Sequence, residues 1–198
     1  MSVRGHILET DKDDHQSAAI ESELIHRVLF RKDNGAFGKL VSMHQSHVRG
    51  FLRRLCKNNA NADDLAQDTF VIAFRQLAQF NGSGSFGGWL MSIAYQCFLQ
   101  ECRRHSRLKQ VYERFSNDTD SESFSHPDRP AENLDMERAM AKLDPIQAAA
   151  ITLNLSLGYS HTEVSNILGL PLGTAKSHIN RGLDRLRAQM NDSCSEIN

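Results

Sequence analysis

The chain has 198 residues, of which 40% are hydrophobic and 24% are charged, and its formal net charge at pH 7 is −1. This composition is ordinary for a globular protein with one large domain or two small ones. The sequence lacks a run of about 18 apolar residues and the pattern of a secretory signal, so we expect neither a membrane-spanning helix nor export. The four cysteines lack the spacing of a zinc ribbon or a thioredoxin motif, which favours a cytoplasmic protein with reduced thiols.

The near-neutral total hides an uneven distribution of charge. Residues 1–35 carry five positive and seven negative side chains, whereas residues 36–104 carry eight positive and four negative ones. Residues 171–190 carry four positive side chains against Asp184 alone. Local fields therefore say more about binding partners than the overall charge does.

Helical spacing of apolar residues recurs in the first half of the chain, and no convincing strand pattern occurs. The spacing predicts a first helix over 20–30 and a second one that is capped by Asp33 and runs to Leu55. Asn61 is the predicted cap of a third helix over 62–80, which begins with two acidic residues. A Gly-Ser turn follows, and Ser85 is the predicted cap of a fourth helix that ends near Arg104.

The composition changes at about residue 105, where Ser, Asp, Asn, Pro and Glu replace apolar residues. Such a segment cannot bury enough surface to become ordered. We therefore predict an all-α protein with two small helical domains that are joined by a flexible linker. The predicted divisions are a mobile segment 1–20, a domain 21–105, a linker 106–131, a second domain 132–190 and a tail 191–198.

The second predicted domain contains a tight corner between two helices. Ser160 and Glu163 have the spacing of a capping box, and Tyr159 and Val164 stand at the positions of a hydrophobic staple. Gly169 can adopt the left-handed conformation that ends a helix, and Pro171 opens the next one. Two helices across so short a turn cross steeply, as in a helix-turn-helix.

The helix after this corner has two different faces. Its apolar side gathers Ala175, Ile179, Leu183 and Leu186, with Gly182 beside them. The opposite side carries hydrogen-bonding and cationic groups, and a DNA major groove admits such a helix. A solvated surface helix is the competing interpretation. The candidate DNA-binding residues on this side are Thr174, Lys176, Ser177, His178, Arg181 and Arg185.

Three stretches resemble the extracytoplasmic-function (ECF) sigma factors of bacterial RNA polymerase. They are "ADDLAQDTFVIAFRQLAQF" (62–80), "SFGGWLMSIAYQCFLQECRR" (85–104) and "LPLGTAKSHINRGLDRLRAQM" (170–190), and they occur in the order that the family has. The resemblance implies a dissociable initiation subunit with regions two and four only. Its implied partners are core RNA polymerase (clamp and flap), promoter DNA and an anti-sigma factor.

The resemblance also implies roles for particular residues. Region two is expected to bind the polymerase clamp and to recognise and melt the minus-ten element, and region four to read the minus-thirty-five element. The polymerase-binding residues are expected to be Asp64, Gln67 and Asp68. The minus-ten residues are expected to be Phe80, Asn81, Trp89, Ser92, Gln96, Gln100 and Arg103. Helix capping is an alternative role for Asp64, and a place in the core is one for Trp89.

The sequence departs from the family pattern at four positions. The family commonly has Asn at the place of Gln96, Asp at Gln100, Arg or Lys at Gly88, and Arg at His178. These differences put the promoter sequence and the affinity for duplex DNA in question more than the class of function.

The pattern indicates a protein without catalysis, cofactor or metal. His44 and His47 have helical spacing for a metal, but without nearby ligands surface histidines are the simpler interpretation. Cys97, Cys102 and His105 do not share one helix face. Two other hypotheses remain: a sigma-like decoy that sequesters an anti-sigma factor without binding DNA, and a stand-alone helix-turn-helix repressor, which leaves the first two motifs unexplained.

Overall fold

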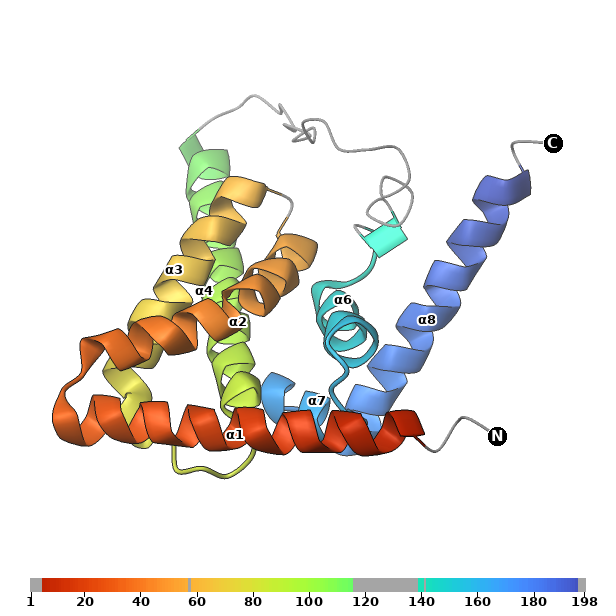
Figure 1. The fold of residues 1–198 in the computed structure, drawn as a ribbon. Helices are drawn as coiled ribbons and strands as arrows, with labels where there is room; N and C mark the ends of the chain where they lie inside the picture. The colour runs from red at the N-terminus through yellow and green to blue at the C-terminus, as the bar shows by residue number, and fades with distance from the viewer. Residues whose placement is uncertain (1–4, 57, 116–138, 141, 196–198) are drawn as a thin grey trace.

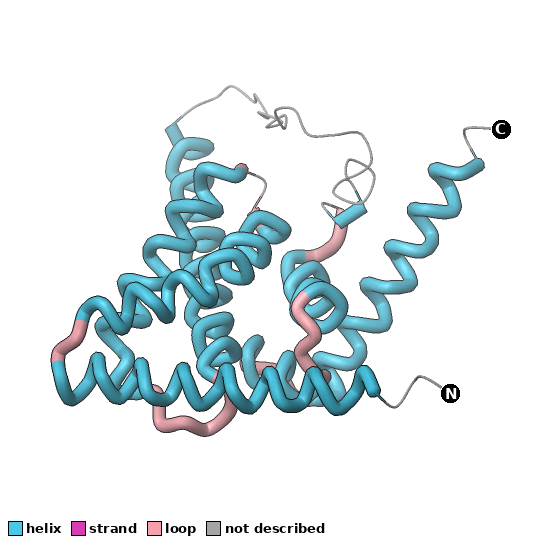
Figure 2. The backbone as a smooth tube through the Cα atoms, viewed as in Figure 1, coloured by secondary structure: helices cyan, strands magenta, loops and turns pink. Residues whose placement is uncertain are grey.

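The computed structural model describes residues 5–56, 58–115, 139–140 and 142–195, and every regular element in these ranges is helical. Figure 1 shows α1 along the base, with α2, α3 and α4 gathered at one end and α6 to α8 at the other; Figure 2 gives the same view by secondary structure. The elements are α1 (Gly5–Arg31), α2 (Asn34–Leu55), α3 (Asn59–Gln76), η1 (Leu77–Gln79), α4 (Phe86–Phe115), α6 (Pro145–Ile151), η2 (Thr152–Ser156), α7 (His161–Leu168) and α8 (Leu172–Ser195).

Side-chain caps fix the starts of the helices in the first half. Asp33 Oδ1 accepts a hydrogen bond from the backbone N–H of Ala36 at 3.1 Å, and Ser85 Oγ accepts one from Gly88 at 3.1 Å. Both predicted caps are confirmed. The predicted cap of α3 is wrong: Asn58, not Asn61, accepts from the Ala60 N–H at 2.8 Å, so the helix begins one turn earlier.

Two helices are longer than the sequence pattern predicts. α1 begins at Gly5 rather than near Ile20, and α4 continues to Phe115, into the predicted linker. Residues 116–131 of that linker, and residues 132–138 of the second predicted domain, lie outside the described residues. The mobility of residues 1–20 and the division into domains stay predictions.

The first half of the chain has a core in which α2 contacts α1, α3 and α4, and α3 contacts α4. Its buried apolar side chains come from all four of these helices. The residues that are almost completely buried include Leu40, Val48, Phe51, Leu52, Leu90 and Met91. Burial of each such side chain stabilises the fold by about 1.5–3 kcal/mol.

The predicted corner is present in the second half. Ser160 Oγ accepts from the Glu163 N–H, and the Glu163 carboxylate accepts from the Ser160 N–H at 2.8 Å, which completes the capping box. Gly169 ends α7 with φ 66°, a conformation that only glycine adopts without strain. α8 then packs against α6 and α7 with Ala175, Ile179 and Leu186 buried, so the predicted apolar face is confirmed.

The two halves of the chain contact one another. α7 lies against α4, and α6 lies against α2. One cluster of buried apolar residues runs from α1 through α4 to α7 and α8 without a break. Among the described helices, none is both long and apolar enough to cross a membrane.

Candidate nucleic-acid interface

The polar face of α8 is largely accessible. Thr174, Lys176 and Arg181 are exposed, whereas Ser177 and His178 are half-buried. The face points away from α6 and α7 because Ala175, Ile179 and Leu186 occupy the opposite side. A helix with accessible hydrogen-bonding groups near its N-terminus and cations behind them can present both base-reading and phosphate-binding groups to a groove.

Arg185 has contacts inside its own half of the molecule. Its Nη1 donates to Asp144 Oδ2 at 3.1 Å and to Gln147 Oε1 at 2.9 Å, and both acceptors stand at the start of α6. The ion pair is solvent-exposed, so it contributes little to stability on its own. Arg185 therefore connects α8 to α6, and its predicted role on DNA stays a prediction.

The predicted minus-ten residues of α4 fall into two groups. Gln96, Gln100 and Arg103 are exposed and follow one another along the helix. Trp89 and Ser92 are half-buried, and the Ser92 hydroxyl donates to the Trp89 carbonyl at 2.7 Å. The accessible stripe is therefore made of amides and one guanidinium.

Trp89 belongs to an aromatic cluster with Phe80 and Phe86, whose ring centroids lie 5.4–5.6 Å apart. This geometry fits the alternative role of Trp89 as a packing residue. Asn81 Oδ1 accepts from the Ser83 N–H at 3.0 Å and shapes the loop before α4. Gly82 and Gly84 both have φ in the left-handed region, with values of 76° and 91°, so the loop depends on glycine there.

A hollow of about 440 Å³ opens beside this loop. Its lining joins the loop to α1 and is rich in aromatic rings. The aromatic residues in the lining are His26, Phe30, Phe80 and Phe86. Phe80 is thus placed at the side of an accessible, ring-lined space, whereas Asn81 lies outside that lining.

The acidic face of α3 is exposed at Asp64, Gln67 and Asp68. The neighbouring acid behaves differently, because Asp63 accepts from Arg53 Nη2 at 3.1 Å and lies 3.6 Å from Arg49 Nε. Within the described residues, Asp63 is thus held by α2, while Asp64 and Asp68 face outwards. Both side chains are accessible, and their polymerase-binding role stays a prediction.

Sequence reasoning missed two apolar residues on the same side of α3. Val71 is 47% exposed and Phe74 is 44% exposed, and the Phe74 ring meets that of Phe37 edge-on at 4.9 Å. Both follow the helical spacing of Asp64, Gln67 and Asp68, and that spacing is the signal that would have found them. Exposed apolar residues beside acids make a mixed patch of the kind that binds proteins.

The cysteines and histidines whose side chains are described do not form a cluster. Burial raises the pKa of Cys56 to about 12 and also raises the pKa of Cys97, so both thiols stay protonated near neutral pH. His44 Nε2 lies 3.0 Å from Glu21 Oε1, an ion-pair distance without hydrogen-bond alignment, and His105 pairs with Glu101. No metal-binding group of three or more His, Cys, Asp or Glu occurs within the described ranges.

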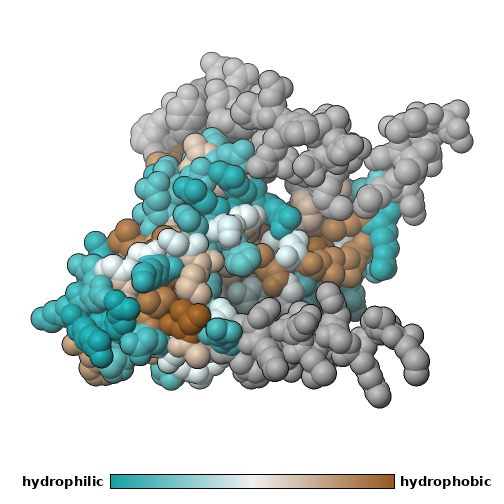
Figure 3. Space-filling model, viewed as in Figure 1, coloured by the Kyte–Doolittle hydropathy of each residue, from teal (hydrophilic) through white to brown (hydrophobic). Residues whose placement is uncertain are grey.

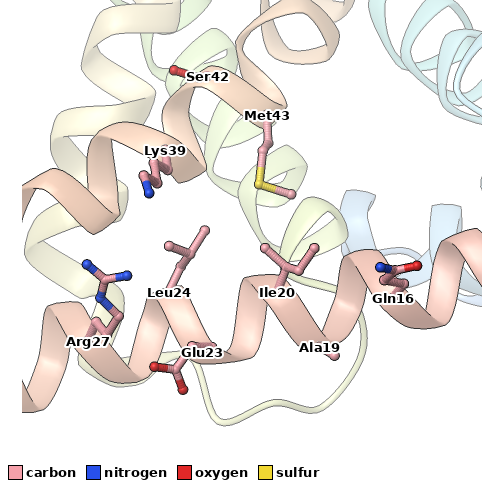
Figure 4. Close-up of a pocket in the computed structure, with 9 residues that line it drawn as sticks. All are labelled: Gln16, Ala19, Ile20, Glu23, Leu24, Arg27, Lys39, Ser42 and Met43. Atoms are coloured by element: carbon pink, nitrogen blue, oxygen red, sulfur yellow. The ribbon is translucent and has the colours of Figure 1, made fainter.

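A larger hollow, of about 690 Å³, lies between α1 and α2. Figure 4 shows Ile20 and Leu24 of α1 and Met43 of α2 pointing into it, with Arg27 and Lys39 at one end. In Figure 3 hydrophobic colour gathers where these two helices meet. None of the predicted site residues lines this hollow.

Two family models match the chain, one in each half. The model of Sigma-70 region 2 matches residues 40–108, and the model of Sigma-70, region 4 matches residues 133–186. The first range contains α3 and the part of α4 that carries Gln96, Gln100 and Arg103. The second range contains the corner between α7 and α8 and the polar face of α8.

Curated relatives agree with both matches. The RNA polymerase sigma factor CarQ of Myxococcus xanthus is 30% identical over 164 residues, which cover 82% of this chain and 93% of CarQ. The ECF RNA polymerase sigma factor SigE of Mycolicibacterium smegmatis is 33% identical over 167 residues, which cover 81% of this chain and 64% of SigE. The chain belongs to the ECF RNA polymerase sigma factors.

Solved structures support the fold of this sigma factor. The sigma factor RpoE of Bartonella quintana, in a co-crystal structure with NepR, has a TM-score of 0.67 and 24% identity over 78% of this chain and 96% of that one. CnrH, in complex with the cytosolic domain of CnrY, has a TM-score of 0.62 and 22% identity over 88% and 97% of the two chains. At these identities the likeness concerns the fold.

Proposed function

We propose that this sigma factor binds core RNA polymerase through the exposed face of α3, at Asp64, Gln67 and Asp68. The observation that carries the proposal is the pair of accessible polar stripes on one chain, on α4 in region two and on α8 in region four. The α4 stripe is suited to single-stranded DNA, and the α8 stripe is suited to duplex DNA. The chain can engage both kinds of DNA in one promoter only if a larger assembly positions the two stripes together. Core RNA polymerase is that assembly.

The minus-ten element is read by α4 and the loop before it. Gln96 and Gln100 offer amides that can pair with base edges, and Arg103 offers a charge for the backbone. The ring-lined hollow beside Phe80 gives an unstacked base a place to lie, because every base can stack on an aromatic face. Trp89 and Ser92 support this surface from behind, and Asn81 shapes its loop.

The minus-thirty-five element is read by α8, with Thr174, Lys176 and Arg181 as the accessible contacts and Ser177 and His178 beside them. The net charge is only +4 for residues 36–104 (eight positive, four negative) and +3 for residues 171–190 (four positive, one negative), so the affinity of the free protein for DNA is low. The two halves gain affinity when polymerase binds both at once and raises the effective concentration of each at its element. The protein works in the cytoplasm with the polymerase and catalyses no reaction of its own.

An anti-sigma factor is a further partner that we propose. RpoE of Bartonella quintana is described in complex with the anti-sigma factor NepR, and CnrH in complex with a domain of CnrY. These complexes suggest a binding protein for this chain as well, whose expected effect is to keep the free chain from polymerase.

The test is reconstitution with purified core RNA polymerase and a library of genomic promoter fragments. Run-off transcripts that appear only when this chain is added, and that map to a shared pair of upstream elements, are the expected result. Core binding that is as weak as for an unrelated protein would instead favour the decoy hypothesis. The exposed Lys176 and Arg181 favour a DNA-binding protein over a decoy, because both cations can bind phosphate groups.

A further inference from the structure

The end of α1 carries an aromatic ring that the core does not use. Phe30 is 74% exposed, the largest exposed fraction among the large hydrophobic residues of the described ranges. The ring of His26, one helical turn earlier, is also exposed, and its centroid lies 4.6 Å from that of Phe30 at an interplanar angle of 30°. The two side chains therefore form a tilted pair of rings on the surface, and burial in the fold does not account for Phe30.

The ring pair borders the ring-lined hollow beside the loop before α4. His26 and Phe30 line this hollow together with Phe80 and Phe86. In Figure 1 the loop passes beneath α1, and η1, which ends next to Phe80, contacts α1. Gly82 and Gly84 line the hollow as well, and a Cβ atom on either would meet nothing within 4 Å. An open, ring-lined space therefore extends from Phe80 to the surface of α1.

The end of α1 next to these rings is positively charged. Arg31 and Lys32 follow Phe30 directly, both are exposed, and neither has an ion-pair partner among the described residues. The acid that follows, Asp33, is already bound by Arg27. Glu21, the acid in the lining of the hollow, lies 3.0 Å from His44 Nε2. The cations at the end of α1 are therefore the groups that remain free to bind an anionic backbone.

Aromatic rings beside free cations are the chemistry that binds single-stranded nucleic acid. Successive bases stack on successive aromatic side chains, while cations bind the phosphates between them. This kind of binding tolerates any base, because every base has an aromatic face. An apolar segment of a protein is the competing ligand, since Leu29 beside Phe30 is also 37% exposed. The two ligands make different demands on Phe30, because a protein segment requires an apolar side chain whereas a base requires a ring.

We propose that His26 and Phe30 of α1 stack a second unstacked base of the promoter strand, next to the base that lies beside Phe80. The proposal rests on the function proposed above for α4 and its loop. A base can stack on these rings only after it has left the duplex. The contact therefore stabilises the opened promoter and not the closed one, so it shifts the equilibrium towards opening without adding a preference for a particular base.

The experiment uses the full-length chain bound to core RNA polymerase, on promoter fragments that carry single thymines at successive positions of the melted region. Permanganate oxidises unstacked thymines, and a thymine that is stacked on a protein ring is protected. Phe30→Leu and His26→Leu remove a ring but keep an apolar side chain, whereas Phe30→Tyr keeps the ring. The matched control is Ile20→Ala, because Ile20 is 48% exposed on the same helix but lies outside the lining of this hollow.

We expect both leucine variants to expose a thymine that is protected in wild type, and their open complexes to dissociate about fivefold or more faster. Phe30→Tyr and Ile20→Ala should behave like wild type. Circular dichroism checks the fold, and Phe30→Leu decides if His26→Leu is unfolded. An unchanged permanganate pattern and lifetime in Phe30→Leu would overturn the proposal. Weaker core binding with normal opening by the bound polymerase would also overturn it, because α1 would then bind a protein.

A failure of the proposed function gives a different result. If wild-type holoenzyme opens none of the fragments, the proposed function is refuted. The ring pair is then tested alone, by fluorescence anisotropy of a labelled oligothymidine with the free full-length chain at low salt. A loss of affinity of about fivefold or more in Phe30→Leu, but not in Ile20→Ala, would keep α1 as a single-strand binding surface. Equal affinities of the two variants would remove it.

Discussion

At the scale of single residues, short polar side chains decide where α7 begins. Ser160 contributes a hydroxyl to the Glu163 N–H, and Glu163 returns a carboxylate to the Ser160 N–H. Two backbone donors that would otherwise lack partners at the helix start are thereby satisfied. A helix of eight residues has few hydrogen bonds of its own, so these contacts matter more here than in a long helix.

The variant Ser160→Ala removes the hydroxyl half of this capping box. We expect the free energy of unfolding to fall by about 1 kcal/mol, the usual cost of losing a serine cap. Urea denaturation followed by far-UV circular dichroism measures the change. Thr162→Ala, an exposed substitution in the same turn, is the control and should leave the midpoint nearly unchanged. Equal effects of the two variants would show that the box does not hold α7.

Cys56 couples stability to alkaline pH. Its pKa is raised from 9.0 to about 12 by burial, with Cys102 and Glu101 adding to the rise, so the folded thiol keeps its proton after the unfolded thiol has lost it. The stabilisation is present below pH 9 and is lost as pH rises from about 9 to about 12. Unfolding in urea at pH 8, 9 and 10 should show a steeper loss of stability for wild type than for Cys56→Ala. Parallel curves would contradict the expected linkage.

At the scale of elements, the sequence predicts those helix boundaries that a capping side chain or a glycine marks, such as Asp33 before α2 and Gly169 after α7. Asp33, Ser85 and Ser160 are found as caps because their short side chains precede apolar periodicity. A local pattern does not reveal the end of α4, because Arg107 and Leu108 favour helix although both are exposed to solvent. The early part of α1 was missed because its stretch of polar residues has no apolar stripe.

The site residues also divide into those that a local sequence pattern predicts and those whose contacts join residues far apart in the sequence. Which side of α8 is buried follows from the spacing of Ala175, Ile179 and Leu186, and so the opposite stripe was predictable. The pairing of Arg185 with Asp144 joins residues 41 apart in sequence, and a local pattern carries no information about it. The Tyr159 hydroxyl lies beside Gly87 of α4, which is 72 residues away in the sequence, and this approach depends on how two helical units meet.

Two acidic residues of α3 lie in different environments, because Asp68 is exposed whereas Asp63 is paired with Arg53. Asp68→Arg reverses a charge on the exposed face, so we expect core-polymerase binding to weaken at least about tenfold while the fold is unchanged, as for other close charge pairs at interfaces. Asp63→Asn, the control, removes the partner of Arg53 and should lower stability slightly with little effect on core binding. Binding is measured by titration against labelled core. Equal binding by both variants would place the polymerase contact elsewhere.

At the scale of the whole molecule, the buried cluster runs through both matched regions. Residues of α4 such as Leu90 and residues of α7 such as Val164 belong to one continuous set of packed side chains. A shared core makes the two halves unfold together, because neither half can open without exposing apolar surface of the other.

Cooperative unfolding is therefore the last prediction, and the single tryptophan makes it measurable. Trp89 fluorescence reports region two, whereas far-UV circular dichroism reports all helices. In wild type both signals should change at the same urea concentration. In Tyr159→Ala the halves uncouple, so the two curves should separate, while Leu108→Ala, an exposed apolar truncation at the far end of α4, should keep them together. Separate curves in wild type itself would mean that the halves unfold independently and that the packing between them is too weak to couple them.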